Sequence, residues 1–433
     1  MRKSSAVLDT ARWDDSRVGS SIHRSCRVAV TAAVAVVVSV VPQVLALAGQ
    51  SGSDSGRSGP TSEASADKSD NVKLVASLPV PDGTAVWDSA TDLDFSGRYA
   101  YMGRWNGSDA RGEAAGGAYI YDIDGRVPKE LSFVPCGGGQ NDVAVVRPGL
   151  LALGYHRNLC GKPSGGITMI DVRDPQRPKV LGSVAQKPWG THTLTAYPGK
   201  DLIYASPGGW GYEGEAEGGG DEYIIDVSNP VRPKVVATFD PKIAGCHDLS
   251  FRITAKSKLA FCAGDTMTQI WDVSDPVEPV VVSSIFNPLT GFNHSAEASP
   301  DGELLAVGEE TFVDDCRDGF MGSVWVYDIS DPANPKLMSY YSIPRGSPIG
   351  DGLFDYTCSA HNFRFIPGTR LLVAAWFQSG MNVLDLSDPA KPEEIAYFDP
   401  AEGSYWSAYW YNGRIYASGA PGLDVFEVKG LPE

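Results

Sequence analysis

The chain has 433 residues and a formal net charge of −17, with 48 glycines and 30 prolines. This charge argues against nucleic acid or an anionic membrane surface as a partner, because both are also negative. The glycine and proline content is high for a helical protein and is typical of many short strands joined by tight turns.

Residues 1–48 have the pattern of a secretory signal peptide. A polar stretch with several arginines precedes the apolar run VAVTAAVAVVVSVVPQVLALA, which ends in Ala46-Leu47-Ala48. A positive region, an apolar region and a small-residue site together indicate export, with cleavage near Ala48. Two alternatives remain: a true start downstream of Met1, or an uncleaved run that anchors the chain in a membrane.

Residues 49–71 have the composition of a linker. The segment GQSGSDSGRSGPTSEASADKSDN contains almost no apolar side chains, so it cannot form a core. We therefore predict a disordered linker between the signal and a domain over residues 72–433.

A repeat organises residues 72–433. Six segments, among them IWDVSDPVEPVVVSSI and VYDISDPANPKLMSYY, contain a strand that ends in Asp, a turn with Pro, and a second strand. Their intervals, counted on to a degenerate seventh segment, are 42 to 57 residues and fit a four-stranded propeller blade with variable loops. The repeated acids are Asp122, Asp171, Asp226, Asp272, Asp328 and Asp385, with Glu427 as a degenerate seventh. We interpret them as structural, because an Asp there can accept backbone N–H groups in an Asx turn.

Each repeat also has two strands upstream, shown best by NHSAEAS, a PDG turn and ELLAVGEE. Their apolar residues alternate with a period of two. The seventh unit ends at Glu433 without a fourth strand, and the segment VKLVASLPVP (residues 72–81) resembles one. We therefore predict an all-β, seven-bladed β-propeller of four-stranded antiparallel blades, its last blade closed by this N-terminal strand.

The motif of IWDVSDPVEP and VYDISDPANP resembles the LVIVD-repeat family of secreted β-propellers, over residues 72–433. The resemblance implies a propeller fold and an extracytoplasmic location. It implies little about activity, because that family is defined by its repeat.

Four of the five histidines outside the signal region share one position, at the start of the first strand of a repeat. They are His192, His247, His294 and His361, whereas the other three repeats have Thr91, Asn141 and Tyr405 there. The first strand of a blade is the innermost, so we expect these imidazoles on an arc at one mouth of the central channel. Neutral imidazole is a ligand for Zn, Cu, Fe or Ni.

Further ligands, or groups that orient the imidazoles, are predicted on the same face: His156, Asp265, Glu309 and Glu310. The alternative is that the four histidines only pack or hydrogen-bond between blades, as a residue copied by duplication would.

Six cysteines follow the signal, and an even number in an exported chain suggests disulfides. Sequence alone allows fifteen connectivities. Strand positions favour sequential pairs that brace the histidine face: Cys136 with Cys160, Cys246 with Cys262, and Cys316 with Cys358. Metal ligation by free thiols is the alternative.

Two functional classes remain open. The chain could be an extracytoplasmic binding or scaffold protein for a protein, glycan or small molecule, or a metal-dependent oxidase or hydrolase that uses the histidines. Methanethiol oxidases also pair a propeller with histidine-bound metal, a likeness of architecture only. Because no acid, base or nucleophile is identifiable, we favour a monomeric binding protein whose only membrane contact would be an uncleaved signal.

Overall fold

The computed structural model contains only strands in the residues that it describes. Contacts divide the chain into residues 1–53 and 54–433, and every described residue belongs to the second unit. No helix in that part of the chain is long and apolar enough to cross a membrane. The described ranges are 66–80, 90–105, 116–136, 138–157, 165–187, 190–207, 221–243, 245–264, 267–310, 322–344, 359–377, 379–400, 404–420 and 422–433.

Five sheets have four antiparallel strands that follow one another in sequence. The first is β3 (Ala90–Ser96), β4 (Tyr99–Arg104), β5 (Gly117–Asp122) and β6 (Lys129–Pro135). The second is β7 (Gly138–Arg147), β8 (Leu150–Arg157), β9 (Gly166–Asp171) and β10 (Lys179–Ala185). The third is β11 (Thr191–Ala196), β12 (Leu202–Pro207), β13 (Glu222–Asp226) and β14 (Lys234–Phe239). The fourth is β15 (Asp248–Ile253), β16 (Lys258–Gly264), β17 (Met267–Asp272) and β18 (Val280–Phe286). The fifth is β19 (Asn293–Ala298), β20 (Leu304–Glu309), β21 (Val324–Asp328) and β22 (Lys336–Tyr341).

The remaining strands form one nine-stranded sheet in the order β1-β26-β25-β24-β23-β27-β28-β29-β2. Its members are β1 (Asp67–Lys68), β2 (Val72–Leu78), β23 (Ala360–Phe365), β24 (Leu371–Trp376), β25 (Gly380–Asp385), β26 (Glu393–Asp399), β27 (Tyr405–Tyr411), β28 (Arg414–Gly419) and β29 (Gly422–Val428). The β23–β27 pairing is parallel, and every other pairing in the sheet is antiparallel. It therefore separates two four-stranded antiparallel groups, and β1 adds to the edge of one of them.

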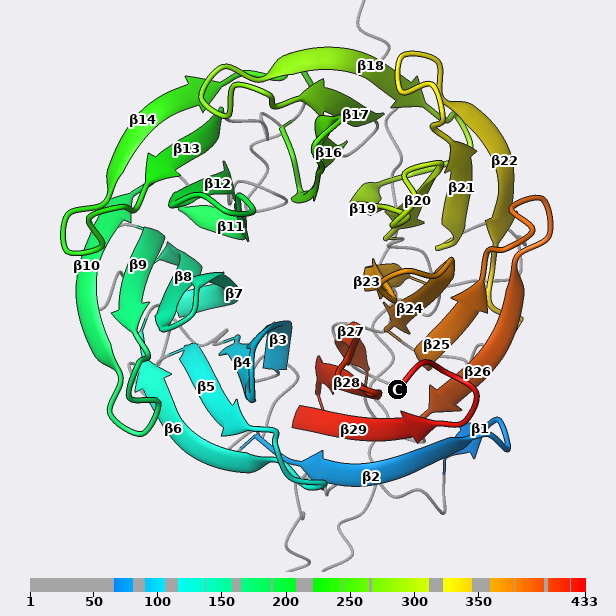
Figure 1. Cartoon of the computed structure of the whole chain (residues 1–433), viewed down its shortest axis with the longest axis horizontal. Coiled ribbons are helices and arrows are strands. Elements are labelled where there is room, and N and C mark those ends of the chain that lie inside the picture. Colours follow the sequence, from blue (N-terminus) through cyan, green and yellow to red (C-terminus); the bar gives the residue numbers. More distant parts are fainter. Residues whose placement is uncertain are drawn as a thin grey trace, which may run out of the picture. The chain divides into compact units, whose positions relative to one another are not determined.

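The sheets stand around a common axis in a β-propeller arrangement, with the first strand of each group innermost (Figure 1). The innermost strands are β3, β7, β11, β15, β19, β23 and β27. Strand β2 pairs with β29, with Val72 opposite Val428. This confirms the predicted pairing of the N-terminal strand with the last unit, which leaves β29 with a partner on each side.

The repeated Asp residues form the predicted Asx turns. The Oδ1 atom of Asp272 accepts the N–H of Ser274 at 2.8 Å, and Asp328 accepts that of Ser330 at 2.9 Å. Asp122, Asp171, Asp226 and Asp385 make the same bond to the residue two positions on. Each bond fixes the reversal between the third and fourth strands of a group.

The core lies between neighbouring sheets. Trp271 and Trp325 are fully buried, and each packs with residues of the preceding sheet in the ring.

Cys246 and Cys262 form a disulfide with a Cα–Cα distance of 5.2 Å, which joins the residue two before β15 to β16 and confirms this predicted pair. Cys136 is also disulfide-bonded. Cys160, Cys316 and Cys358 lie outside the described residues, so their pairings stay predictions.

Candidate metal centre at the histidine row

Irregular pairing at the start of three innermost strands affects His192, His294 and His361, whereas His247 lies just before β15. In β19 the register shifts between Asn293 and Ser295, which leaves His294 unpaired in the ladder. Similar shifts flank His192 in β11 and His361 in β23. Such a bulge adds a residue to one strand and re-aims its side chain. The shifts explain how these side chains depart from the regular alternation of their strands and face the channel mouth.

The structure brings all four predicted histidines, and His156, into one continuous row. His156 Nε2 lies 2.8 Å from His192 Nδ1, and His192 Nε2 lies 2.7 Å from His247 Nε2. The ring centroids of His247 and His294 are 4.2 Å apart, and those of His294 and His361 are 3.9 Å apart. The four imidazoles therefore contact each other directly and do not turn into separate contacts between sheets.

Aromatic side chains complete a circle with the row. The Trp406 ring lies 4.5 Å from that of His361, and the Trp105 ring lies 5.5 Å from Trp406 and 6.4 Å from His156. Trp105, Trp406 and Phe377 form a buried cluster of their own. One side of the mouth is thus rich in nitrogen ligands, whereas the other side is apolar.

The alignment that placed Tyr405 with the histidines is wrong by one residue. The parallel register sets Asn362 opposite Ser407, so Trp406 is the residue equivalent to His361. The hydroxyl of Tyr405 instead donates to Asp424. Because aromatic and small residues come in pairs in YWSAYW, a period-two pattern fits either register, and the sequence does not distinguish them.

Burial keeps the imidazoles neutral. Loss of solvation lowers the pKa of His247 and of His361 to about 3 in each case, and it lowers the pKa of His192 and His294 well below the usual value. Neighbouring imidazoles lower the pKa of His192, His247 and His294 further. His361 Nδ1 lies 2.6 Å from the Trp406 carbonyl oxygen and donates to it, which leaves Nε2 with a lone pair. Neutral rings with free lone pairs are the form that binds metals.

One group in the row offers a metal-binding set. A ring nitrogen of His247, a ring nitrogen of His294 and a carboxylate oxygen of Glu310 all lie within 4.8 Å of one another, and all three residues are buried. His294 Nε2 is 3.9 Å from Glu310 Oε2. Tetrahedral zinc with bonds of about 2.0–2.2 Å needs ligand atoms roughly 3.4 Å apart, so a shift of under about 1.5 Å would close the set. Two imidazoles and a carboxylate suit Zn, Cu or Fe.

The other predicted ligands are placed differently. Glu309 accepts hydrogen bonds from the Gly291 N–H at 2.7 Å and from Trp325 Nε1 at 3.4 Å, so its carboxylate is already hydrogen-bonded within the protein. His156 is half-buried at one end of the row. Asp265 lies outside the described residues.

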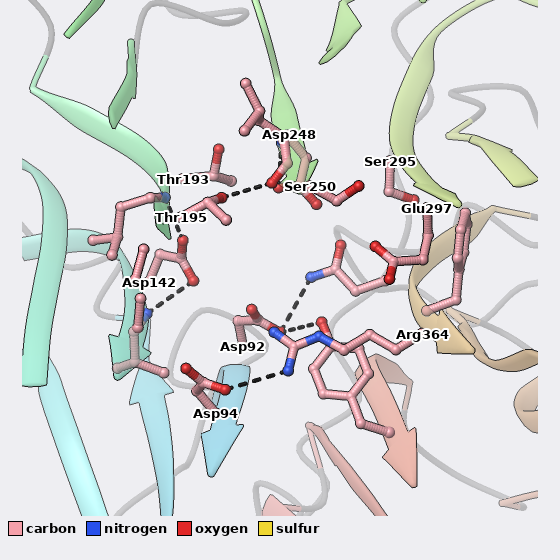
Figure 2. A pocket seen from close by; sticks show the side chains of 18 of the residues that line it. Asp92, Asp94, Asp142, Thr193, Thr195, Asp248, Ser250, Ser295, Glu297 and Arg364 are labelled. Carbon is pink, nitrogen blue, oxygen red and sulfur yellow. Dashed lines mark hydrogen bonds and ion pairs between the residues drawn. The ribbon is translucent and has the colours of Figure 1, made fainter. Parts of the chain in front are cut away.

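A chamber continues the channel from the histidines along the innermost strands. Its volume is about 270 Å³, and His294 and His361 are part of its wall. Five acidic residues line it: Asp92, Asp94, Asp142, Asp248 and Glu297. Figure 2 shows these side chains and Arg364 approaching one space from different sheets. Burial raises the pKa of Glu297 to about 7 and that of Asp142 well above its usual value. Sequence reasoning missed this chamber.

Comparison with known proteins identifies the repeat. Residues 216–240 and 320–342 match the family model of the LVIVD repeat. The chain carries LVIVD repeats. These matches cover the third and fourth strands of two sheets, and all five histidines of the row lie outside them. The LVIVD motif therefore describes the outer part of the fold and does not describe the metal-binding set.

Two solved structures are similar in fold. The periplasmic gluconolactonase PpgL of Pseudomonas aeruginosa has a TM-score of 0.53 and 14% identity, over 72% of this chain and 88% of that one. Sqt1 of Saccharomyces cerevisiae has a TM-score of 0.53 and 10% identity, over 83% of this chain and 100% of that one. At such identities only the fold is shared. A search of the curated proteins finds no match.

Proposed function

We propose that this chain is an exported, seven-bladed β-propeller that binds one transition-metal ion at the mouth of its channel. The observation that carries the proposal is the buried group of His247, His294 and Glu310, whose ligand atoms lie within 4.8 Å of one another. Burial of Glu310 beside neutral imidazoles disfavours the ionised form of its carboxyl group, and a bound divalent ion would stabilise that form.

The sheet topology supports a count of seven. Five four-stranded sheets and the two halves of the nine-stranded sheet each provide one innermost strand. The disulfide between Cys246 and Cys262 supports export, since disulfides persist mainly outside the reducing cytosol. The signal-like segment of residues 1–48 supports the same location.

The neighbouring rings support a centre that is fixed in position. His192 contacts His247, and His361 packs against His294, so each ligand is held by an adjacent imidazole. If His192 and His361 also bound the ion beside His247 and His294, the number of nitrogen ligands would rise to four. We propose Zn, Cu or Fe as the ion, because imidazole suits each of them.

A second candidate function is a metal-dependent oxidase or hydrolase. Three protein ligands on an ion with four positions leave one open for water or substrate. The chamber that His294 and His361 help to line would give a small molecule access to that position. Binding without chemistry remains our first proposal, because the pKa values of His247 and His361 lie far below neutral pH and the Glu310 carboxyl group is itself a member of the metal-binding set.

Metal analysis of the untagged, purified protein tests the proposal. We expect about one equivalent of a transition metal after aerobic or anaerobic purification, or after reconstitution with Zn²⁺, Cu²⁺ or Fe²⁺. The double variant His247→Ala, His294→Ala should lose it. The matched control His156→Asn removes a histidine from the end of the row and should keep it.

A protein that holds no stoichiometric metal under any of these conditions would overturn the proposal. Equal metal content in the double variant and the wild type would also overturn it. For the second candidate, release of product from a model ester or thiol only by the metal-loaded protein would favour an enzyme over a binding protein.

A further inference from the structure

The chamber holds far more acidic than basic side chains. Five carboxyl groups line it, and Arg364 is the one basic side chain among its lining residues. Arg364 Nη1 lies 3.3 Å from Asp94 Oδ1, and its guanidinium carbon lies 4.1 Å from the centre of the Tyr409 ring. A single guanidinium therefore leaves an excess of four carboxyl groups. Buried carboxylates without counter-charges are costly, so the chamber is suited to a cationic ligand.

Four hydroxyl groups around the chamber already donate their hydrogens within the protein. Thr193 Oγ1 donates to the His247 carbonyl at 2.5 Å, and Thr195 Oγ1 donates to the Leu249 carbonyl at 2.6 Å. Ser295 Oγ donates to the carbonyl oxygen of His361 at 2.6 Å, and Tyr409 donates to Asp92 at the same distance. What these hydroxyls can still offer to a ligand is their lone pairs.

Two buried amide oxygens point to the same kind of ligand. Asn362 and Gln140 line the chamber and are 7% and 3% exposed. Their Nδ2 and Nε2 atoms donate to Ser407 Oγ at 3.1 Å and to the His192 carbonyl at 3.4 Å. Their oxygens have no hydrogen-bond partner among the described residues. Buried acceptors without donors are unfavourable, and a ligand rich in N–H groups would satisfy them.

The spacing of the carboxylates does not suit a bare metal ion. In the described part of the chain, His247, His294 and Glu310 are the one group of three or more potential ligands within 4.8 Å of each other. The carboxyl groups of the chamber lie on β3, β7, β15 and β19 around the channel and do not form such a group. A ligand with several donors separated by a carbon chain fits this spacing better than one ion at bond distances of about 2.0–2.6 Å.

We propose that the chamber binds an organic cation with primary ammonium groups, such as a short alkyl diamine. An ammonium group is a pure donor with three N–H bonds, which complements a wall of acceptors. The volume of about 270 Å³ is enough for a small molecule of this kind. The inference goes beyond the proposed metal centre, because the chamber shares with its row only His294 and His361 and does not depend on a bound ion.

Calorimetric titration with 1,4-diaminobutane tests this inference. We expect one equivalent to bind, both to chelator-treated protein and to protein reconstituted with Zn²⁺. The neutral analogue 1,4-butanediol has the same length and should not bind detectably. Ca²⁺ should neither bind in the chamber nor displace the diamine. Binding to the chelator-treated protein separates this result from the fate of the metal proposal.

Variants locate the site. Glu297→Gln keeps the shape of the side chain and should weaken diamine binding by about 10-fold or more, because hydrogen bonds to charged groups are strong. Asn362→Leu removes an acceptor without changing charge and should also weaken it. The matched control Glu130→Gln alters an exposed carboxylate on an outer strand and should leave affinity unchanged. Melting curves of each variant check that it is folded.

Three results would overturn the inference. These are no binding of the diamine, equal binding of the diol, and undiminished diamine affinity in both Glu297→Gln and Asn362→Leu. Displacement of the diamine by equimolar Ca²⁺ would assign the chamber to an inorganic cation instead.

Discussion

The acidic residues on the outside of the ring and those along the channel behave in opposite ways. Asp171 accepts the Arg173 N–H in its turn, and the Arg173 side chain together with this bond lowers the pKa of Asp171 to about 2. Glu310 at the channel mouth is buried, which raises its pKa to about 8. Both residues follow the same rules of solvation and hydrogen bonding. The difference is that the outer acids are at least partly exposed and hydrogen-bonded within their own turn, whereas the inner ones are buried.

The outer acids serve the folding of each repeat, whereas the inner residues determine what the whole ring can bind. The outer Asp recurs in six segments because every group of strands needs the same reversal. The inner positions vary from Thr91 and Asn141 through four histidines to Trp406. The neutral imidazoles lie there, and the amide oxygens of Gln140 and Asn362 that lack a partner lie beside them, so binding is expected where the repeat changes.

The largest expected effect concerns metal-linked stability. Zn²⁺ at 1,000 times its dissociation constant should stabilise the wild-type protein by about 4.1 kcal/mol, because an ion that binds only the folded state shifts the unfolding equilibrium. His294→Ala should abolish this gain in a thermal or urea melt. The outer variant Asp272→Asn should keep it. A gain that survives in His294→Ala would show that the inner site is not where the ion binds.

The disulfide between Cys246 and Cys262 provides the second test. Replacing both with Ala should lower the free energy of unfolding by about 3 kcal/mol, because a closed loop of this length restricts the unfolded chain. The measurement is urea denaturation of the oxidised proteins. A change below about 1 kcal/mol would mean that the bond next to His247 contributes little beyond local packing.

Glu222 gives a pH-dependent test at the start of β13. It is 1% exposed, Ser206 donates to Oε1 at 3.1 Å, and burial raises its pKa to about 8. Between pH 5 and pH 8 the folded protein holds a proton here that the unfolded chain has lost, so this group makes stability fall as pH rises. Glu222→Gln should therefore be more stable than wild type at pH 8, by on the order of 2 kcal/mol, and similar at pH 5.

Urea melts at the two pH values measure this difference. If the free energy of unfolding of the variant differed from that of wild type by the same amount at pH 5 and at pH 8, the expectation would be wrong. Glu130→Gln, on the exposed outer strand β6, is the control and should show no offset at either pH.

The smallest effect is expected for one outer turn. Asp272→Ala removes the hydrogen bond to the Ser274 N–H and should cost about 1 kcal/mol, the usual net value for one such bond. Its metal content should equal that of wild type. Loss of metal in this variant would show that the outer acids also affect metal binding, contrary to the expectation.

Local features of the fold were predictable from the sequence. The Asx turn, the four-strand unit and the N-terminal strand β2 each depend on short patterns that recur along the chain. The row was predictable because four of five histidines share one position. Its bulges were not, since no residue type marks the extra residue at His192 or His294.

The acidic residues of the chamber recur at a fixed spacing in the sequence. Its acids lie one or three residues after the aligned ring positions, as Asp92 and Asp94 follow Thr91 and as Glu297 follows His294. On an innermost strand that spacing places side chains on the channel side. Which of these side chains lack partners depends on contacts between sheets, and these are set only when the ring is closed.

The pairing of β2 with β29 has a consequence for the time course of folding. Val72 lies opposite Val428, and Asp67 in β1 lies opposite Asp399 in β26, so both ends of the domain contribute to the same sheet. A chain made from its N-terminus cannot form these pairs until nearly all of it has been synthesised. Contacts of such long range form slowly. Until β29 is made, β2 has no partner strand and β28 has an open edge, and both can pair with other chains, so the nascent protein is most exposed to misassembly just before its last strand arrives.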